Sequence, residues 1–224
     1  MNEATKPKED LADVRKEIDS LDSQIQDLIS ARARLALRVR ESKGDSTSAV
    51  DFFRPEREAQ VLRSVVDRND GPLSDSEMIR LFREIMSACL AQQEPLKIAY
   101  LGPEGTFTQQ AVHKHFGQSV HALSHPAIDV VFEQVQSGEA DFGVVPVENS
   151  TQGIVSHTLD MFLDSDLKIC GEIELRVHQN LLTHAKNLSQ IERVYSHEQS
   201  ISQCKAWLRN HLPGVELIAC LLYT

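Results

Sequence analysis

Residues 11–42 decide the fold of the first half of the chain: they read LADVRKEIDSLDSQIQDLISARARLALRVRES, with neither glycine nor proline. Apolar side chains recur there every three or four residues, which is the spacing of one face of an α-helix. Such a helix would be roughly 48 Å long. An amphipathic helix of that length needs a partner for its apolar face, either another helix of the chain or a second copy. The face comprises Leu11, Val14, Ile18, Leu21, Ile25, Leu28, Leu35 and Val39.

Two shorter helices are predicted to follow the long one. Pro55 suits the first turn of a second helix, which the turn at residues 69–72 stops. Residues 74–77, SDSE, form a capping box that starts a third helix. We therefore expect an all-helical domain at residues 1–95 and a second domain at residues 96–224.

Composition argues against several classes of function. The 224 residues carry a formal net charge of −10, so nucleic acid is not an expected partner. No apolar run approaches the roughly 20 residues of a membrane span, and no secretory signal is apparent, which favours a cytoplasmic protein. The four cysteines are far apart in sequence, and we predict no metal site.

One arginine interrupts the apolar face of the long helix. Burying an unpaired guanidinium is costly, so Arg32 is either a cation that reaches out to solvent or a group that binds a carboxylate. Arg15 flanks the same face roughly 25 Å away along the helix. One small ligand cannot touch both from the same helix. Antiparallel pairing of two copies would bring them together, which predicts a homodimer with shared sites.

Two segments of the first half resemble the all-helical (AroQ-class) chorismate mutase family: residues 14–22, VRKEIDSLD, and residues 53–58, FRPERE. The resemblance covers about residues 10–94. It implies a three-helix, domain-swapped dimer that converts chorismate to prephenate without a cofactor. It places carboxylate-binding arginines at Arg15 (donated by the partner chain) and Arg32. It further implies catalytic roles for Lys43, Glu56 and Gln93 and substrate-binding roles for Arg57 and Cys89, while Phe52 stands where the family has an acidic residue.

The second half is predicted to be an α/β domain with polar residues where its strands end. We expect strands at 97–101, 142–147, 193–195 and 215–219, extended stretches at 168–170 and 173–182, and helices ending near 116 and at about 130–137, 154–163 and 199–211. Polar side chains follow three of the strands: Thr106, Glu148 with Asn149, and Ser196. Ligands bind at the carboxyl ends of strands in open α/β sheets, although these residue types also cap helices.

These junctions resemble the prephenate dehydratase family, in residues 102–108, GPEGTFT, residues 143–150, GVVPVENS, and residues 195–197, YSH. The resemblance implies a periplasmic-binding-like (type II) α/β fold with prephenate bound between two lobes. It implies catalytic roles for Glu148, Asn149, Ser196 and Gln203, and places Thr106 in a substrate-binding turn.

The two families are fused in this order in the bifunctional isomerase and lyase of bacterial phenylalanine synthesis. That family's dehydratase domain continues through a Thr-Arg-Phe motif and is followed by a phenylalanine-binding ACT domain. We therefore expect an incomplete dehydratase domain in a truncated chain, without feedback by phenylalanine.

Two alternatives stay open from the residues themselves. One is a non-catalytic dimeric module, in which a small-ligand-binding fold hangs from a helical stalk. Arg32 argues against it, because a pure stalk would place an apolar residue there. The other keeps the helical mutase alone beside a poorly folded segment from residue 97 onward, which a protease-resistant fragment ending near residue 95 would reveal.

Overall fold

The computed structural model describes residues 10–43, 53–92, 95–149 and 153–220, without the side chains of residues 40, 42 and 43. The chain divides into two compact units, which are described separately. The first comprises Met1–Lys97 with Phe116–His121, and the second comprises Ile98–His115 with Ala122–Thr224.

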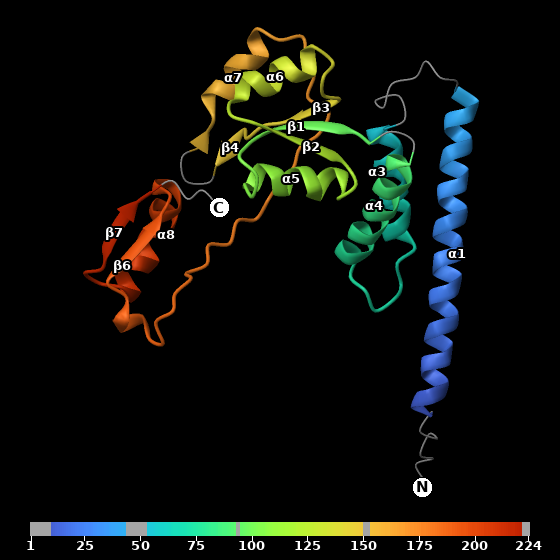
Figure 1. Cartoon of the computed structure of the whole chain (residues 1–224), viewed down its shortest axis with the longest axis horizontal. Coiled ribbons are helices and arrows are strands. Elements are labelled where there is room, and N and C mark those ends of the chain that lie inside the picture. The colour runs from blue at the N-terminus through green and yellow to red at the C-terminus, as the bar shows by residue number, and fades with distance from the viewer. Residues whose placement is uncertain (1–9, 44–52, 93–94, 150–152, 221–224) are drawn as a thin grey trace. The chain divides into compact units, whose positions relative to one another are not determined.

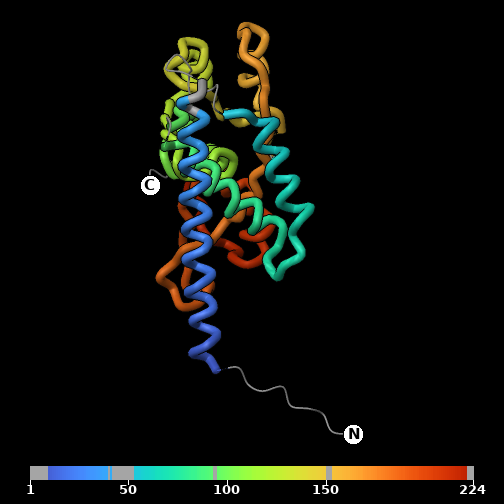
Figure 2. Tube along the Cα trace, turned by 90° about the vertical axis from the view of Figure 1, so that its right-hand side faces the viewer, coloured from blue at the N-terminus to red at the C-terminus, as the bar shows by residue number. Residues whose placement is uncertain are grey.

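Helix α1 (Leu11–Lys43) dominates the first unit and runs without interruption (Figure 2). It begins where expected because the Asp10 carboxylate accepts a hydrogen bond from the backbone N–H of Ala12, at 3.1 Å. Its length of 33 residues agrees with the glycine- and proline-free sequence. The prediction of one long helix is confirmed.

Helices α3 (Pro55–Asp67) and α4 (Asp75–Ala91) complete the described part of this unit. Ser74 caps α4 as predicted, since its hydroxyl accepts from the backbone N–H of Glu77 at 3.3 Å. The two helices contact each other, and α4 also contacts α1. Val65 and Cys89 are among the buried apolar side chains of α3 and α4.

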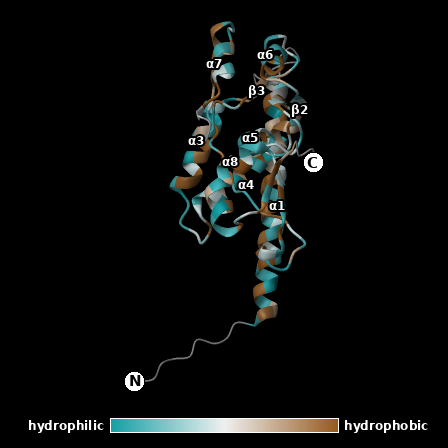
Figure 3. Ribbon diagram, turned by 90° about the vertical axis from the view of Figure 1, so that its left-hand side faces the viewer, coloured by the Kyte–Doolittle hydropathy of each residue, from teal (hydrophilic) through white to brown (hydrophobic). Residues whose placement is uncertain are grey.

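Apolar residues, brown in Figure 3, recur along α1, and those of its apolar face remain largely exposed in the single chain. Leu28 is 70% exposed, whereas Arg32 is half-buried. Leu81 of α4 is also exposed, at 40%. One chain therefore leaves most of the α1 face uncovered.

A parallel sheet forms the centre of the second unit (Figure 1). Its strands lie in the order β2-β1-β3, and β1 and β3 run parallel. Helix α5 lies on one side of this sheet, and α6 and α7 lie on the other. A small buried cluster of Ala99, Val131 and Ala140 packs the sheet against α6. The bounds are β1 (Lys97–Leu101), α5 (Phe107–Phe116), β2 (His121–His125), α6 (Ile128–Gln136), β3 (Phe142–Val144) and α7 (Ser156–Leu163).

A second parallel pair lies toward the C-terminus, β6 (Arg193–Ser196) with β7 (Glu216–Ala219). Helix α8 (Glu198–His211) connects the two strands, and a short 3-10 turn, η1 (Leu188–Gln190), precedes β6. Buried Leu208 and Leu212 anchor the end of this helix. The order of strand, helix and strand agrees with the prediction.

Two local predictions were wrong. Strand β2 was missed, because Leu123 is the one large aliphatic residue in HALSH and polar neighbours hide the alternation. The strand expected at 142–147 stops at Val144, and a hairpin of β4 (Glu148–Asn149) and β5 (Gly153–Ile154) follows it. Residues 168–182, predicted as extended stretches, pair into no sheet, and their apolar side chains Ile169 and Leu182 are 72% and 90% exposed.

Candidate functional site

The two arginines predicted to bind carboxylates lie 17 residues apart on α1. Arg15 is exposed and Arg32 is half-buried. At 1.5 Å per residue their backbones are roughly 25 Å apart, too far for one small ligand. The helix geometry thus supports the expectation that any site using both needs two chains. Lys43 is the last residue of α1, and its side chain lies outside the described atoms.

The remaining mutase-type candidates lie on α3 and α4. Glu56 is exposed in the first turn of α3, beside the exposed Arg57, whose Nη1 donates to Gln60 at 3.3 Å. Cys89 is a buried thiol, 3% exposed, in α4. Gln93 and the divergent Phe52 lie outside the described residues. Within the described ranges, no hydrogen bond or ion pair joins these candidates to one another.

An ion pair that sequence analysis missed joins the second and third helices. Arg83 Nε lies 3.3 Å from Glu58 Oε1, and the two side chains are only 22% and 17% exposed. Burial raises the pKa of the Glu58 carboxyl above its usual value, and the hydrogen bond and charge of Arg83 offset part of this rise. The pair is 25 residues apart in sequence, so no local pattern could reveal it. It is a contact between α3 and α4.

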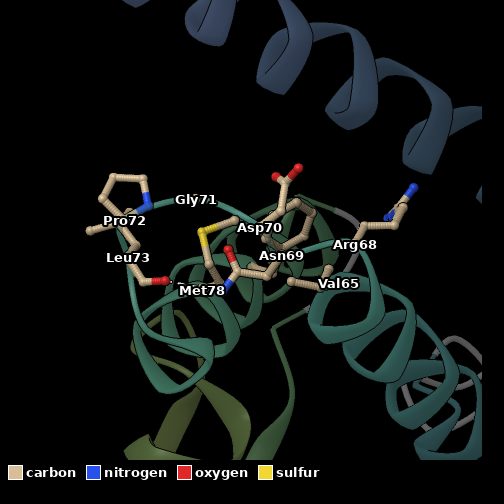
Figure 4. Close-up of a pocket in the computed structure, with 9 residues that line it drawn as sticks. Val65, Arg68, Asn69, Asp70, Gly71, Pro72, Leu73 and Met78 are labelled. Carbon is tan, nitrogen blue, oxygen red and sulfur yellow. Dashed lines mark hydrogen bonds between the residues drawn. The ribbon is translucent and has the colours of Figure 1, made fainter.

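A surface hollow of about 500 Å³ lies at the turn between α3 and α4 (Figure 4). Its walls combine apolar side chains, such as Val65 and Met78, with the polar Asn69. The Asn69 amide is already committed, because it donates to Leu73 O at 3.0 Å and to Asp75 Oδ1 at 2.7 Å. None of the predicted site residues lines this hollow, so it is best explained as part of the turn.

In the second unit, the β1–α5 turn carries the predicted Thr106. Its hydroxyl donates to Leu101 O and accepts from the backbone N–H of Gln109, both at 3.4 Å. The turn passes so close to β2 that a Cβ on Gly102 would lie 2.0 Å from Ser124 Oγ. Thr106 therefore has a clear structural role as the cap of α5, in the turn that follows the carboxyl end of β1.

The structure brings two of the predicted dehydratase residues together, Asn149 of β4 and Gln203 of α8. Gln203 Nε2 donates to Asn149 Oδ1 at 3.5 Å, across 54 residues of sequence. A third amide, that of Gln179, donates from Nε2 to Gln203 Oε1 at 2.9 Å. Sequence analysis missed Gln179, because it lies in an extended stretch without a motif.

The other two candidates of this unit lie near strand ends, and among the described residues no side-chain hydrogen bond joins them to the amides. Glu148 is exposed in β4, and Ser196 is half-buried at the end of β6. The prediction that Glu148 and Asn149 form a strand-to-helix junction needs correction, because β5 intervenes before α7. At the third junction the helix cap is His197, whose Nδ1 accepts from the backbone N–H of Gln199 at 3.2 Å.

Two further properties bear on the kind of site. In the described ranges, no three His, Cys, Asp or Glu side chains are grouped so as to hold a metal ion. The helices of the same ranges include none with the length and apolar character that crossing a bilayer requires.

Comparison with known families assigns both halves of the chain. Residues 98–221 match the family model for prephenate dehydratase, which covers more than half of the chain. Residues 14–94 match the model for chorismate mutase type II. The chain belongs to the prephenate dehydratase family. A helical domain of the chorismate mutase type precedes a dehydratase domain with a parallel sheet, as the resemblances implied.

Two relatives are named for the same pair of activities. The chain is 54% identical over 210 residues to a bifunctional chorismate mutase/prephenate dehydratase of Stutzerimonas stutzeri. It is 41% identical over 214 residues to that of Aquifex aeolicus. These alignments cover 92% and 94% of this chain but 58% and 59% of the relatives, so the chain spans under two thirds of their length.

One solved structure is also similar, a prephenate dehydratase of Arthrobacter aurescens in complex with L-Phe. Sequence identity is 30%, and the TM-score is 0.43. The match covers 56% of this chain and 42% of that one.

Proposed function

We propose that the protein acts in phenylalanine biosynthesis, rearranging chorismate to prephenate in residues 1–95 and dehydrating prephenate to phenylpyruvate at residues 96–224. The observation that carries this proposal is the order of the two family matches along one chain, 14–94 and then 98–221. Relatives with that combination are named as bifunctional enzymes. We assign the protein to the cytoplasm, where it needs no cofactor.

The proposed mutase site is formed by two chains. The rearrangement is pericyclic, so it requires neither a nucleophile nor a base. Arg15 of one chain and Arg32 of the other bind the two carboxylates of chorismate through charge-assisted hydrogen bonds. Lys43 and Gln93 stabilise the negative charge that develops on the breaking ether oxygen, and Glu56 lies near the ring hydroxyl. Arg57 and Cys89 complete the substrate-binding set.

The exposed apolar row of α1 supports a homodimer with this arrangement. The exposed apolar row of α1 needs a cover, and antiparallel pairing of two α1 helices would also reduce the distance of roughly 25 Å that separates Arg15 from Arg32. The same pairing would therefore bury the row and assemble the site.

The proposed dehydratase step expels carbon dioxide and the ring hydroxyl from prephenate. The carboxylate's C–C bond breaks, its electron pair enters the ring, and the hydroxyl leaves with one added proton as water. Aromatisation drives the reaction, so the protein must supply a proton donor and hydrogen bonds to the anionic substrate. We assign the hydrogen-bonding roles to Glu148, Asn149, Ser196 and Gln203, with Thr106 in the binding turn. In the family, the catalytic threonine belongs to the Thr-Arg-Phe motif that follows these residues. The contact between Gln203 and Asn149 supports grouping them in one site.

A paired assay tests the proposal on the purified chain. Chorismate loss is followed by absorbance, and phenylpyruvate formation is followed after prephenate is added. Arg32→Ala should lower the mutase kcat/KM by about 10²–10³-fold, the range for loss of a charge-assisted contact. Arg34→Ala is the matched control, because residue 34 is exposed. It lies two positions after residue 32, so it is on nearly the opposite face of the helix. Equal rates for the two variants would overturn the mutase site, and absence of phenylpyruvate would overturn the dehydratase assignment.

A further inference from the structure

Three side-chain amides form a row in the second unit. Gln179 Nε2 lies 2.9 Å from Gln203 Oε1, and Gln203 Nε2 lies 3.5 Å from Asn149 Oδ1. Gln203 and Asn149 are half-buried, whereas Gln179 is exposed. The first contact is well within hydrogen-bonding distance, and the second is at its outer limit. The row therefore begins at the surface and leads to two residues of the proposed dehydratase site.

The row has a direction because each amide has one acceptor and one donor end. Gln203 Oε1 is the atom that accepts from Gln179. This contact leaves Gln203 Nε2, with its two N–H groups, facing Asn149. Asn149 in turn receives at Oδ1, which leaves Nδ2 as the donor end of that side chain. The contact with Gln179 thus orients the amide of Gln203, and the contact with Gln203 orients the amide of Asn149.

Prephenate is a dianion, and a site for it needs hydrogen-bond donors rather than acceptors. A reversed Gln203 amide would present its carbonyl oxygen to Asn149 and to the substrate. We propose that Gln179 is a positioning residue, which holds the Gln203 amide with its N–H groups toward Asn149 and the bound prephenate. This inference rests on the dehydratase function proposed above and extends it to a residue outside the motifs.

Four variants test the proposal through prephenate turnover. Gln179→Met removes the donor at nearly constant size and should lower kcat/KM about tenfold, the effect of one lost hydrogen bond. Gln179→Glu can only accept, so it should reverse the Gln203 amide and lower kcat/KM further. Gln179→His restores an N–H donor at Nε2 and should recover most of the activity. Asn180→Asp is the charge control, since Asn180 is exposed and its amide contacts His178 O instead.

A measurement without substrate separates this inference from the proposed function. The side-chain amide resonance of Gln203 is recorded by ¹H–¹⁵N NMR, assigned through its loss in Gln203→Leu. We expect it to shift in Gln179→Met and Gln179→Glu and to stay in place in Asn180→Asp. A resonance that does not move in Gln179→Met overturns the contact and the proposal.

The two arms together distinguish the possible failures. Equal losses of kcat/KM in Gln179→Glu and Asn180→Asp would show a simple charge effect and overturn the positioning role. A wild-type chain that never forms phenylpyruvate, but whose Gln203 resonance shifts in Gln179→Met, would uphold the amide orientation and remove the dehydratase function instead. Full activity in Gln179→Met would also overturn the proposal.

Discussion

Replacing Leu28 with glutamate is expected to prevent two chains from pairing through α1. Leu28 is 70% exposed in the single chain, and residues at similar spacing along α1 are exposed to a comparable degree. These are Leu11, Ile18, Leu21, Ile25, Leu35 and Val39, at 50–62%. Burying the whole row would contribute about 6–12 kcal/mol per chain, enough in two chains to offset the cost of association.

The magnitude of the Leu28→Glu effect follows from its exposed fraction. Burying the exposed part of one leucine is worth about 1–2 kcal/mol, and a twofold dimer loses that twice. Each unpaired carboxylate in the interface adds a desolvation cost, which raises the total above about 5 kcal/mol. The dimer dissociation constant should therefore rise by about three to four orders of magnitude.

Sedimentation equilibrium across a concentration series measures this constant. Ser23→Glu is the matched control, because residue 23 is exposed and lies on nearly the opposite face of α1 from Ile25 and Leu28. Circular dichroism should show unchanged helix content in both variants. A wild-type chain that is monomeric throughout the series, or a Leu28→Glu chain as dimeric as the wild type, would refute the reasoning.

Three further predictions concern the free energy of unfolding, measured by urea denaturation. Burial raises the pKa of Glu58 in the folded state. The stability that Glu58 contributes should therefore be largest at a pH below its unfolded-state pKa and be lost as pH rises through its folded-state pKa. The difference in free energy of unfolding between wild type and Glu58→Gln should change from about pH 4.5 upward. An unchanged difference between pH 4 and pH 7 would contradict this. Thr158→Val should cost about 1–3 kcal/mol, because the fully buried hydroxyl donates to Pro146 O at 2.6 Å, while Thr158→Ser should retain most of the stability. Tyr100→Phe should leave stability unchanged or raise it by about 1 kcal/mol, since the buried Tyr100 hydroxyl has no partner among the described residues; a loss above about 2 kcal/mol would contradict this.

Much of the helical architecture could be predicted from local patterns. The starts of α1 and α3 follow from residues within one turn of each start, namely Asp10 and Pro55. Ser74 likewise marks the start of α4 through a contact three residues away. Strand β2 could not be predicted in this way, because its side chains alternate weakly and its place beside β1 decides its structure.

The candidate site likewise combines residues that local motifs indicate with residues that only the folded chain brings together. Motifs indicated Asn149 and Gln203 as site residues, but they did not indicate Gln179, which lies 24 residues from Gln203. They also grouped Glu148 with a strand-to-helix junction, where the structure has a hairpin. Residues with no shared motif become neighbours only when the chain folds.

The sequence by itself determined the two-domain organisation, the long helix and the residue types available for chemistry. These depend on periodicity, capping and motif, whose interactions reach only a few residues along the chain. Only the tertiary structure decided that Glu58 pairs with Arg83, that three amides form a row, and that the apolar face of α1 remains uncovered in one chain. The contacts join residues 24 to 54 positions apart in sequence, and they form only when the elements pack together. The exposure of the α1 face likewise depends on what packs against it, so no local pattern encodes either.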